Sequence, residues 1–183
     1  MFIAQELRKK NIAEYLLYMW QVEDMIRAAG LDSDRLYDAV IKVSKRSDDE
    51  CREWKQWYDD LIEMMRAEGK TQSGHLQINV NVIADMTELH LRLLKEGQDA
   101  IYTSCFYSTL PYIVELRGRE GENKLGELET CFTALYGLMI LNMQKREISE
   151  QTKVAMQQIS KFIALLADKY KAWKNGELDF DED

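Results

Sequence analysis

The chain has 183 residues, of which 46% are hydrophobic and 31% charged, and its formal net charge is −8 at pH 7. This length and composition are typical of one globular domain, or of two small ones. The acidic balance, without any long cluster of Lys and Arg, excludes the electrostatic surface of a protein that binds duplex nucleic acid or an anionic membrane. We therefore expect neither nucleic acid nor a membrane among its partners.

The composition favours helices almost throughout. The chain contains one Pro and nine Gly beside nine Met, and few runs of β-branched residues. The longest uncharged stretches, 100–114 and 130–144, are shorter than the roughly 20 residues that a membrane-spanning helix needs. Cys51, Cys105 and Cys131 lack CxxC spacing, which suits a reducing compartment. The sequence predicts an all-α, cytoplasmic protein.

The first expected helix begins near Ile3 and ends at Gly30, a residue type typical of helix C-termini. Its segment 11–29 is apolar on more than one side, so we expect other helices to surround it. Glu23 falls inside the apolar arc of this central helix, and Arg27 follows one turn later. These two residues are the first candidate site.

Serines mark the starts of the next three expected helices. Ser33 is predicted to cap a short helix, and Ser47 to open a longer one in a capping box with Glu50. After a loop over 67–74, Ser73 is predicted to cap the fourth helix. We interpret the strand-like alternation of QINVNVIA, which follows, as the beginning of that helix.

The second half of the chain contains three expected helices. The one over 99–116 includes Pro111, which predicts a kink, or a break with Thr109 capping a new start. A loop over 117–123 precedes the helix 125–143, which is apolar nearly all round. Ser149 caps the last helix, and Gly176 ends it.

These elements predict a single-domain, up-and-down helical bundle of about six or seven helices over residues 1–176. The apolar segments Ile12 to Ile26 and Leu128 to Met143 are expected at its centre. The remaining residues, 177–183, form an acidic tail with little to bury, and we expect it to be mobile.

The predicted buried polar site comprises Glu23, Arg27, Asn79 and His90. A carboxylate among aromatic residues can act as an acid or base. Glu followed by Arg four residues later is also the favourable order for a structural ion pair, and we favour that interpretation. His90 shares the apolar face of its helix with Asn79, where a hydrogen-bonded core histidine is more common than a ligand. Tyr102, Tyr107 and Tyr112 are candidate lining of a pocket beside this site.

Metal chemistry has one alternative to consider. The chain has two His and no Glu-x-x-His motif, so a di-iron centre is not expected, and we predict no cofactor. The all-α nucleotide pyrophosphohydrolases bind magnesium with EExxE and ExxD motifs on neighbouring helices. Their spacing is imitated by Asp59, Asp60 and Glu63, followed by Asp85 and Glu88. Because both sets lie opposite the apolar stripes of their helices, we expect them to face water.

The opening FIAQELRKKNIAEYLLYMWQVEDMIRA and the block LGELETCFTALYGLMILNMQKREIS resemble the Bacteroidetes family called domain of unknown function 4924. The likeness covers the whole chain, including its length and acidic end. The resemblance implies a compact, cytoplasmic, all-helical protein. It implies no activity and no functional residues.

Two functions follow as hypotheses. The first is a non-enzymatic interaction protein that self-associates or binds another protein, because Tyr18, Trp57 and Met64 exceed one apolar stripe and can form a surface patch. The second is a hydrolase that depends on magnesium or manganese and uses the helix carboxylates.

Overall fold

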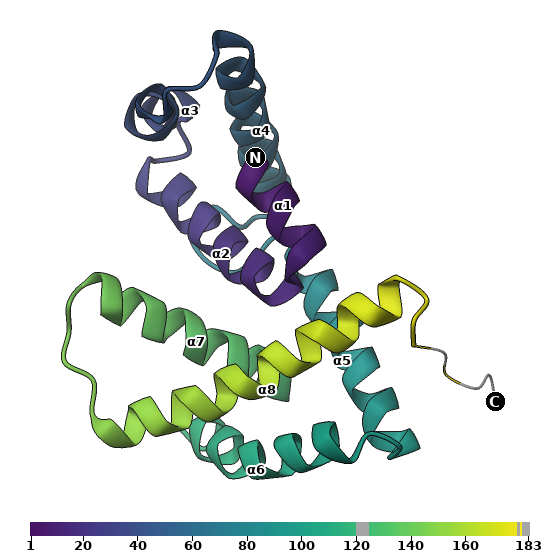
Figure 1. The fold of residues 1–183 in the computed structure, drawn as a ribbon. Coiled ribbons are helices and arrows are strands. Elements are labelled where there is room, and N and C mark those ends of the chain that lie inside the picture. Colours follow the sequence, from purple (N-terminus) through teal and green to yellow (C-terminus); the bar gives the residue numbers. More distant parts are fainter. Residues whose placement is uncertain (120–124, 179, 181–183) are drawn as a thin grey trace. The chain divides into compact units, whose positions relative to one another are not determined.

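The computed structural model describes all residues except 120–124, 179 and 181–183. The described residues contain eight α-helices and no strand (Figure 1), which confirms the all-α class. The contacts divide the chain into two compact units, 1–10 with 14–81, and 11–13 with 82–183. The predicted domain extent, 1–176, stays a prediction.

The expected first helix is two helices, α1 (Phe2–Lys10) and α2 (Ile12–Ala28). Asn11 separates them, and its Oδ1 accepts a hydrogen bond from the N–H of Ala13 at 3.0 Å. An Asn side chain in this position replaces the backbone bonds of a helix start, so the chain restarts there. The end at Gly30 is confirmed, because this glycine has a φ of +71° beyond the last turn of α2.

The segment between α2 and the next long helix begins with a short helix, α3 (Ser33–Leu36). The predicted cap at Ser33 is wrong: Asp32 is the N-cap, and its carboxylate accepts the N–H groups of Asp34 and Arg35. A carboxylate one residue earlier reaches these N–H groups, and it is also favoured by the helix dipole. The remaining elements are a π-helical turn (Tyr37–Ile41), a 3-10 turn (Lys42–Ser44) and α4 (Asp48–Ala67).

Two expected features of α4 and of the following helix are confirmed. The capping box of Ser47 and Glu50 at the start of α4 is present. Residues 77–84 are helical, in α5 (Gln77–Glu96). The cap at Ser73 is wrong, since α5 begins four residues later. There Glu23 of α2 accepts the N–H of Leu76, just before the helix, and Glu68, just after α4, accepts the N–H of Gln77.

Helix α6 (Ala100–Arg117) runs through Pro111 without a break. Thr109 does not cap a new helix; its hydroxyl donates to the backbone oxygen of Cys105, one turn back, at 2.7 Å. The missing N–H of a single proline is tolerated because the neighbouring turns keep their bonds. The predicted break is therefore wrong.

The last two helices are α7 (Glu127–Met143) and α8 (Glu150–Lys174). Ser149 caps α8 as predicted, and its hydroxyl accepts the N–H of Thr152 at 3.2 Å. The expected loop 117–123 lies partly outside the described residues, as does most of the tail 177–183. The mobility of that tail stays a prediction.

The two apolar segments differ in burial. Helix α2 is enclosed as predicted: Leu16, Trp20 and Ile26 are almost completely buried. Helix α7 is enclosed only in its first half, where Cys131 and Phe132 are buried. Beyond Phe132 the side chains of α7 are half-buried or exposed. The extended contacts of α7 are with α6 and α8, and these two helices do not cover its second half. The prediction that 128–143 lies at the centre along its whole length is wrong.

Candidate functional site

The carboxylate of Glu23 is completely buried in the first unit. Its Oε1 accepts hydrogen bonds from the backbone N–H of Leu76 at 3.0 Å and from Nδ2 of Asn79 at 2.6 Å. Its Oε2 accepts one from Nδ1 of His75 at 2.7 Å. A buried carboxylate is costly unless such donors surround it. The three donors satisfy Glu23, and all three lie at or before the start of α5.

Sequence reasoning missed His75. Its imidazole stacks on the indole of Trp20, with ring centroids 3.9 Å apart and ring planes 10° apart. The one available signal was that His75 directly follows Gly74, at the end of a polar loop that must lie near a helix. Periodicity cannot assign a partner to a loop residue.

Arg27 contacts Glu23 only at the limit of an ion pair, with Nη2 and Oε2 4.0 Å apart. Its guanidinium instead donates to the backbone oxygens of Lys70, at 3.2 Å, and Gly74. It also pairs with Asp24 at 2.8 Å. Glu23 and Arg27 therefore hold the same loop. Glu23 accepts hydrogen bonds from N–H groups at its end, and Arg27 donates hydrogen bonds to its backbone carbonyl oxygens.

This arrangement orders the segment between α4 and α5. Glu23 holds its end, Arg27 holds its middle, and the carboxylate of Glu68 accepts the N–H of Gln77 at 2.7 Å. Negative charge near the first turn of a helix is favourable, because the free N–H groups there carry partial positive charge. These contacts support the structural interpretation of Glu23.

His90, the fourth residue of the predicted site, lies in the second unit and does not take part in these contacts. It is 1% exposed, and its Nδ1 is 2.6 Å from the hydroxyl of Tyr102. Its Nε2 faces the carboxylate of Glu127 at 3.8 Å. If the Tyr102 hydroxyl donates to Nδ1, neutral His90 carries its proton on Nε2, which has no hydrogen bond to the described residues. Phe106 and Phe162 pack edge-on against the ring.

This environment predicts a pH dependence of stability. Burial lowers the pKa of His90 from 6.5 to about 4, so below pH 6.5 the unfolded chain binds a proton that the folded chain does not. The free energy of unfolding should fall by about 2–3 kcal/mol as the pH drops from 7 to 4.5. Urea titrations of the wild type and of His90→Gln, which keeps an acceptor for Tyr102, separate this effect from that of carboxylates. Equal pH slopes in the two proteins would contradict it.

The three tyrosines do not line one pocket. Tyr102 is completely buried against His90, and Tyr107 is 60% exposed. Tyr112 lines a separate hollow of about 220 Å³ between α6 and the beginning of α8, with Glu115 and Arg119. Spacings of five residues rotate successive tyrosines around the helix, which explains the separation.

The acidic residues of the metal hypothesis are engaged or exposed. Asp59 pairs with Lys55 at 3.4 Å, and Asp60 accepts from Gln56 at 2.8 Å. Asp85 accepts from Tyr170 and pairs with Lys174 at 3.2 Å, while Glu63 and Glu88 are exposed. Within the part of the chain that the structure describes, no three His, Cys, Asp or Glu residues are grouped so that they could hold a metal ion.

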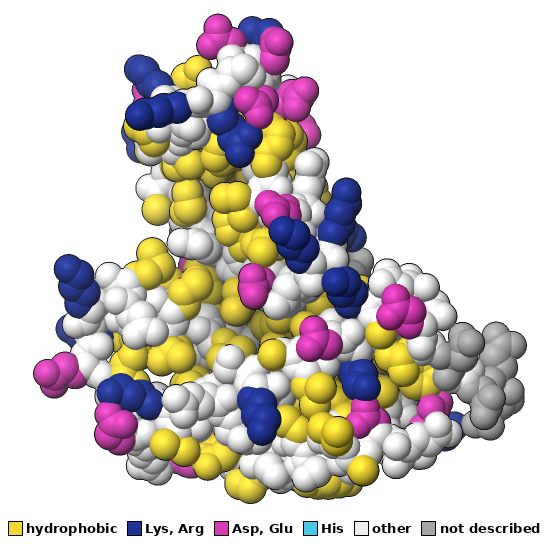
Figure 2. Space-filling view, in the orientation of Figure 1, with side chains coloured by type: hydrophobic (Ala, Val, Ile, Leu, Met, Phe, Trp, Pro, Cys, Tyr) yellow, Lys and Arg dark blue, Asp and Glu magenta, His cyan; other side chains and the backbone are white. Residues whose placement is uncertain are grey.

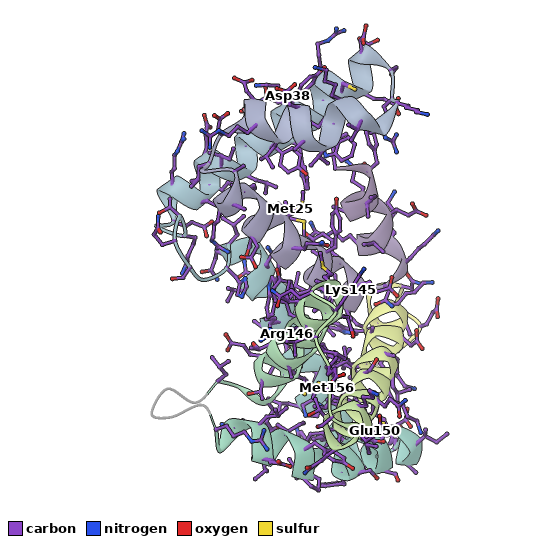
Figure 3. All side chains as sticks on the ribbon, turned by 90° about the vertical axis from the view of Figure 1, so that its left-hand side faces the viewer. Met25, Asp38, Lys145, Arg146, Glu150 and Met156 are labelled. Atoms are coloured by element: carbon purple, nitrogen blue, oxygen red, sulfur yellow. The ribbon has the colours of Figure 1, made fainter. Side chains whose placement is uncertain are left out.

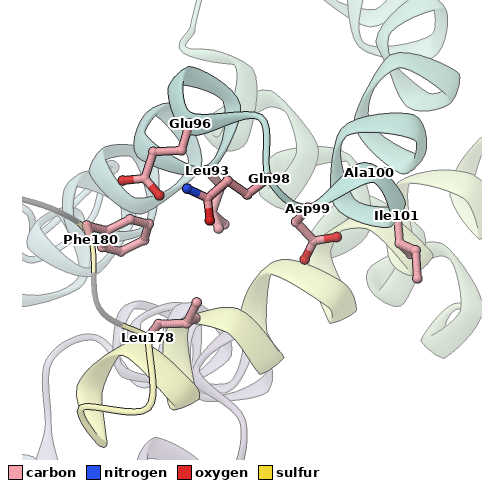
Figure 4. A pocket seen from close by; sticks show the side chains of 8 residues that line it. All are labelled: Leu93, Glu96, Gln98, Asp99, Ala100, Ile101, Leu178 and Phe180. Carbon is pink, nitrogen blue, oxygen red and sulfur yellow. The ribbon is translucent and has the colours of Figure 1, made fainter.

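A second hollow, of about 380 Å³, lies at the turn between α5 and α6 (Figure 4). Leu178 and Phe180 from the end of the chain line it together with Leu93 and Ile101. Its carboxylate Asp99 is already bonded, to Nζ of Lys169 at 2.5 Å and to the N–H of Tyr102. The hollow combines apolar surface with two carboxylates, the bonded Asp99 and the exposed Glu96.

The protein is all-α, and its buried carboxylate, Glu23, and its buried histidine, His90, are both bonded to side chains or backbone groups of the fold. The chain belongs to the family described as domain of unknown function (DUF4924), whose model matches residues 1–177. The origin in Bacteroidetes stays a prediction. Comparison with curated proteins and with solved structures found no match. None of the described helices has the length and apolar character needed to cross a membrane.

Proposed function

We propose that this protein is a cytoplasmic, non-enzymatic interaction module that self-associates through the second half of α7. No residue from Thr130 to Gln144 is charged. Yet Leu138, Met139 and Ile140 are only half-buried, and Leu141 and Met143 are 38% and 62% exposed. Figure 2 shows apolar side chains over this part of α7. A helix that is apolar on all sides needs a cover, and an exposed apolar patch is typical of a protein interface.

A second copy of the chain suits this surface. Helix α7 begins with the acidic residues Glu127 and Glu129, and it is followed by Lys145 and Arg146 in the turn before α8 (Figure 3). Two antiparallel copies of α7 would place the acidic start of each beside the basic end of the other. Gly137, whose missing side chain faces open space, permits a close helix crossing. Shape and charge are thus both compatible with a two-fold interface.

The patch predicted from Tyr18, Trp57 and Met64 contributes less to this proposal. All three side chains are half-buried, so they present less apolar surface than the end of α7. The cytoplasmic location is supported by Cys51, Cys105 and Cys131, which are buried and unpaired.

Light scattering on the purified chain tests the interface. The wild type is expected to have the mass of a dimer, and the double variant Leu141→Glu/Met143→Glu the mass of a monomer, because charges buried in an apolar contact are costly. Val43→Glu, at another exposed apolar residue (68%), is the matched control and should leave the dimer intact. A monomeric wild type, or a double variant that stays dimeric, would contradict the proposal.

The hydrolase with magnesium or manganese remains the alternative function. A thermal shift assay with each metal and with nucleotides tests it, because a ligand at 100 times its dissociation constant adds about 2.7 kcal/mol to stability. The absence of any shift would remove its support.

A further inference from the structure

We infer that His75 is a nucleophilic site that accepts a phosphoryl group on Nε2. Its ring is fixed on both sides: Nδ1 donates to the buried Oε2 of Glu23 at 2.7 Å, and one face stacks on Trp20. Because a carboxylate only accepts, the proton of neutral His75 lies on Nδ1. The lone pair is therefore on Nε2, which makes no hydrogen bond to the described residues, while 29% of the side chain is exposed.

The second histidine of the chain, His90, has a different arrangement and serves as an internal comparison for His75. A buried carboxylate behind an exposed imidazole is the geometry that orients a histidine as a base or nucleophile. In His90 the carboxylate lies on the other nitrogen, and the ring is 1% exposed. An electrophile can reach His75 but not His90.

The neighbouring charge favours a phosphoryl group over a neutral acyl group. The side chain of Lys70 lies over Gly74, the residue before His75, and its ammonium is 3.4 Å from the position that a Cβ of Gly74 would occupy. This ammonium makes no ion pair with a described residue. A cation in the loop that carries the nucleophile, next to the residue before it, can bind the oxygens of a phosphoryl donor.

The phosphoryl transfer is a substitution at phosphorus. Nε2 attacks the phosphorus of a small donor, an acyl phosphate or a phosphoramidate, and the P–O or P–N bond of the donor breaks with its electron pair. The new Nε2–P bond makes the ring an imidazolium. Its Nδ1 proton is held by Glu23, so the positive charge forms beside a negative one. The leaving group departs as a carboxylate, or as an amine after protonation by water.

The experiment is incubation of the full chain with phosphoramidate, followed by tandem mass spectrometry and ³¹P NMR. One phosphoryl group is expected on His75 and none on His90, at a rate about tenfold or more above that of His75 in the urea-unfolded chain. His75→Gln, whose amide can still donate to Glu23, should take up none. Lys70→Met, which changes a loop side chain without a structural partner, should slow the reaction.

Two results would overturn the inference. One is a folded chain in which His75 is unmodified, or is modified no faster than in the unfolded chain. The other is a rate that is the same in folded Glu23→Gln as in the wild type, because the carboxylate would then not orient the ring. The unfolded-chain reference keeps the test decisive even if Glu23→Gln does not fold. None of these outcomes depends on whether α7 forms an interface.

Discussion

Replacing Glu23 by Ala should lower the free energy of unfolding by about 3–5 kcal/mol. The substitution removes the acceptor of three donors, the N–H of Leu76, the amide of Asn79 and the imidazole of His75. Each buried donor that is left without a partner costs about 1–3 kcal/mol. Glu23→Gln should cost less, because its carbonyl oxygen can still accept from Leu76 and Asn79. Urea unfolding followed by tryptophan fluorescence measures both changes.

The matched control is Glu14→Ala, an exposed carboxylate on the same helix. Its effect should stay below about 1 kcal/mol, the usual contribution of a carboxylate in the first turn of a helix. A gain in stability for Glu23→Gln would contradict the structural interpretation, because it would mean that the carboxylate is a strained group kept for another purpose. A uniform loss at all three variants would point to the helix rather than to the carboxylate.

Replacing Phe162 by Ala should have an effect of similar size in the second unit, about 3–5 kcal/mol. Phe162 is completely buried, and its ring contacts those of His90, Tyr102 and Phe106 at centroid distances of 5.5–5.9 Å. Removing it leaves a cavity that these rings cannot all fill, because His90 and Tyr102 are bonded to each other.

Val154→Ala on the same helix is the control, since Val154 is 53% exposed. It should change the free energy of unfolding by no more than about 0.5 kcal/mol. In the Phe162→Ala variant, hydrogen exchange should show reduced protection of the backbone amides of α6, α7 and α8. A change below about 1 kcal/mol would contradict the packing of this aromatic cluster.

Local sequence signals predicted most of the helices. The capping box at Ser47, the cap at Ser149 and the terminal Gly30 each act through their own backbone neighbours, so their pattern is readable without tertiary structure. The burial of Glu23 followed from the helical period alone. Local signals failed at Asn11, because a single cap inside an apolar pattern is a weak signal, and at the predicted caps Ser33, Ser73 and Thr109.

The partners of the buried groups could not be predicted in the same way. Glu23 is bonded to residues more than 50 positions later, and only the fold brings them together. The grouping of His90 with Asn79 followed from their shared helix face, yet α5 passes from one unit to the other between them. The prediction that α7 is enclosed along its whole length failed for a similar reason, since an apolar pattern requires a neighbour but does not say which element provides it.

Hydrogen–deuterium exchange of the second half of α7, measured over a range of protein concentrations, tests the proposed function most directly. If a second copy covers this surface, the amides of residues 136–146 should exchange more slowly in concentrated protein and faster on dilution, while those of α2 stay constant. The same exchange in α7 at every concentration would contradict self-association through this helix.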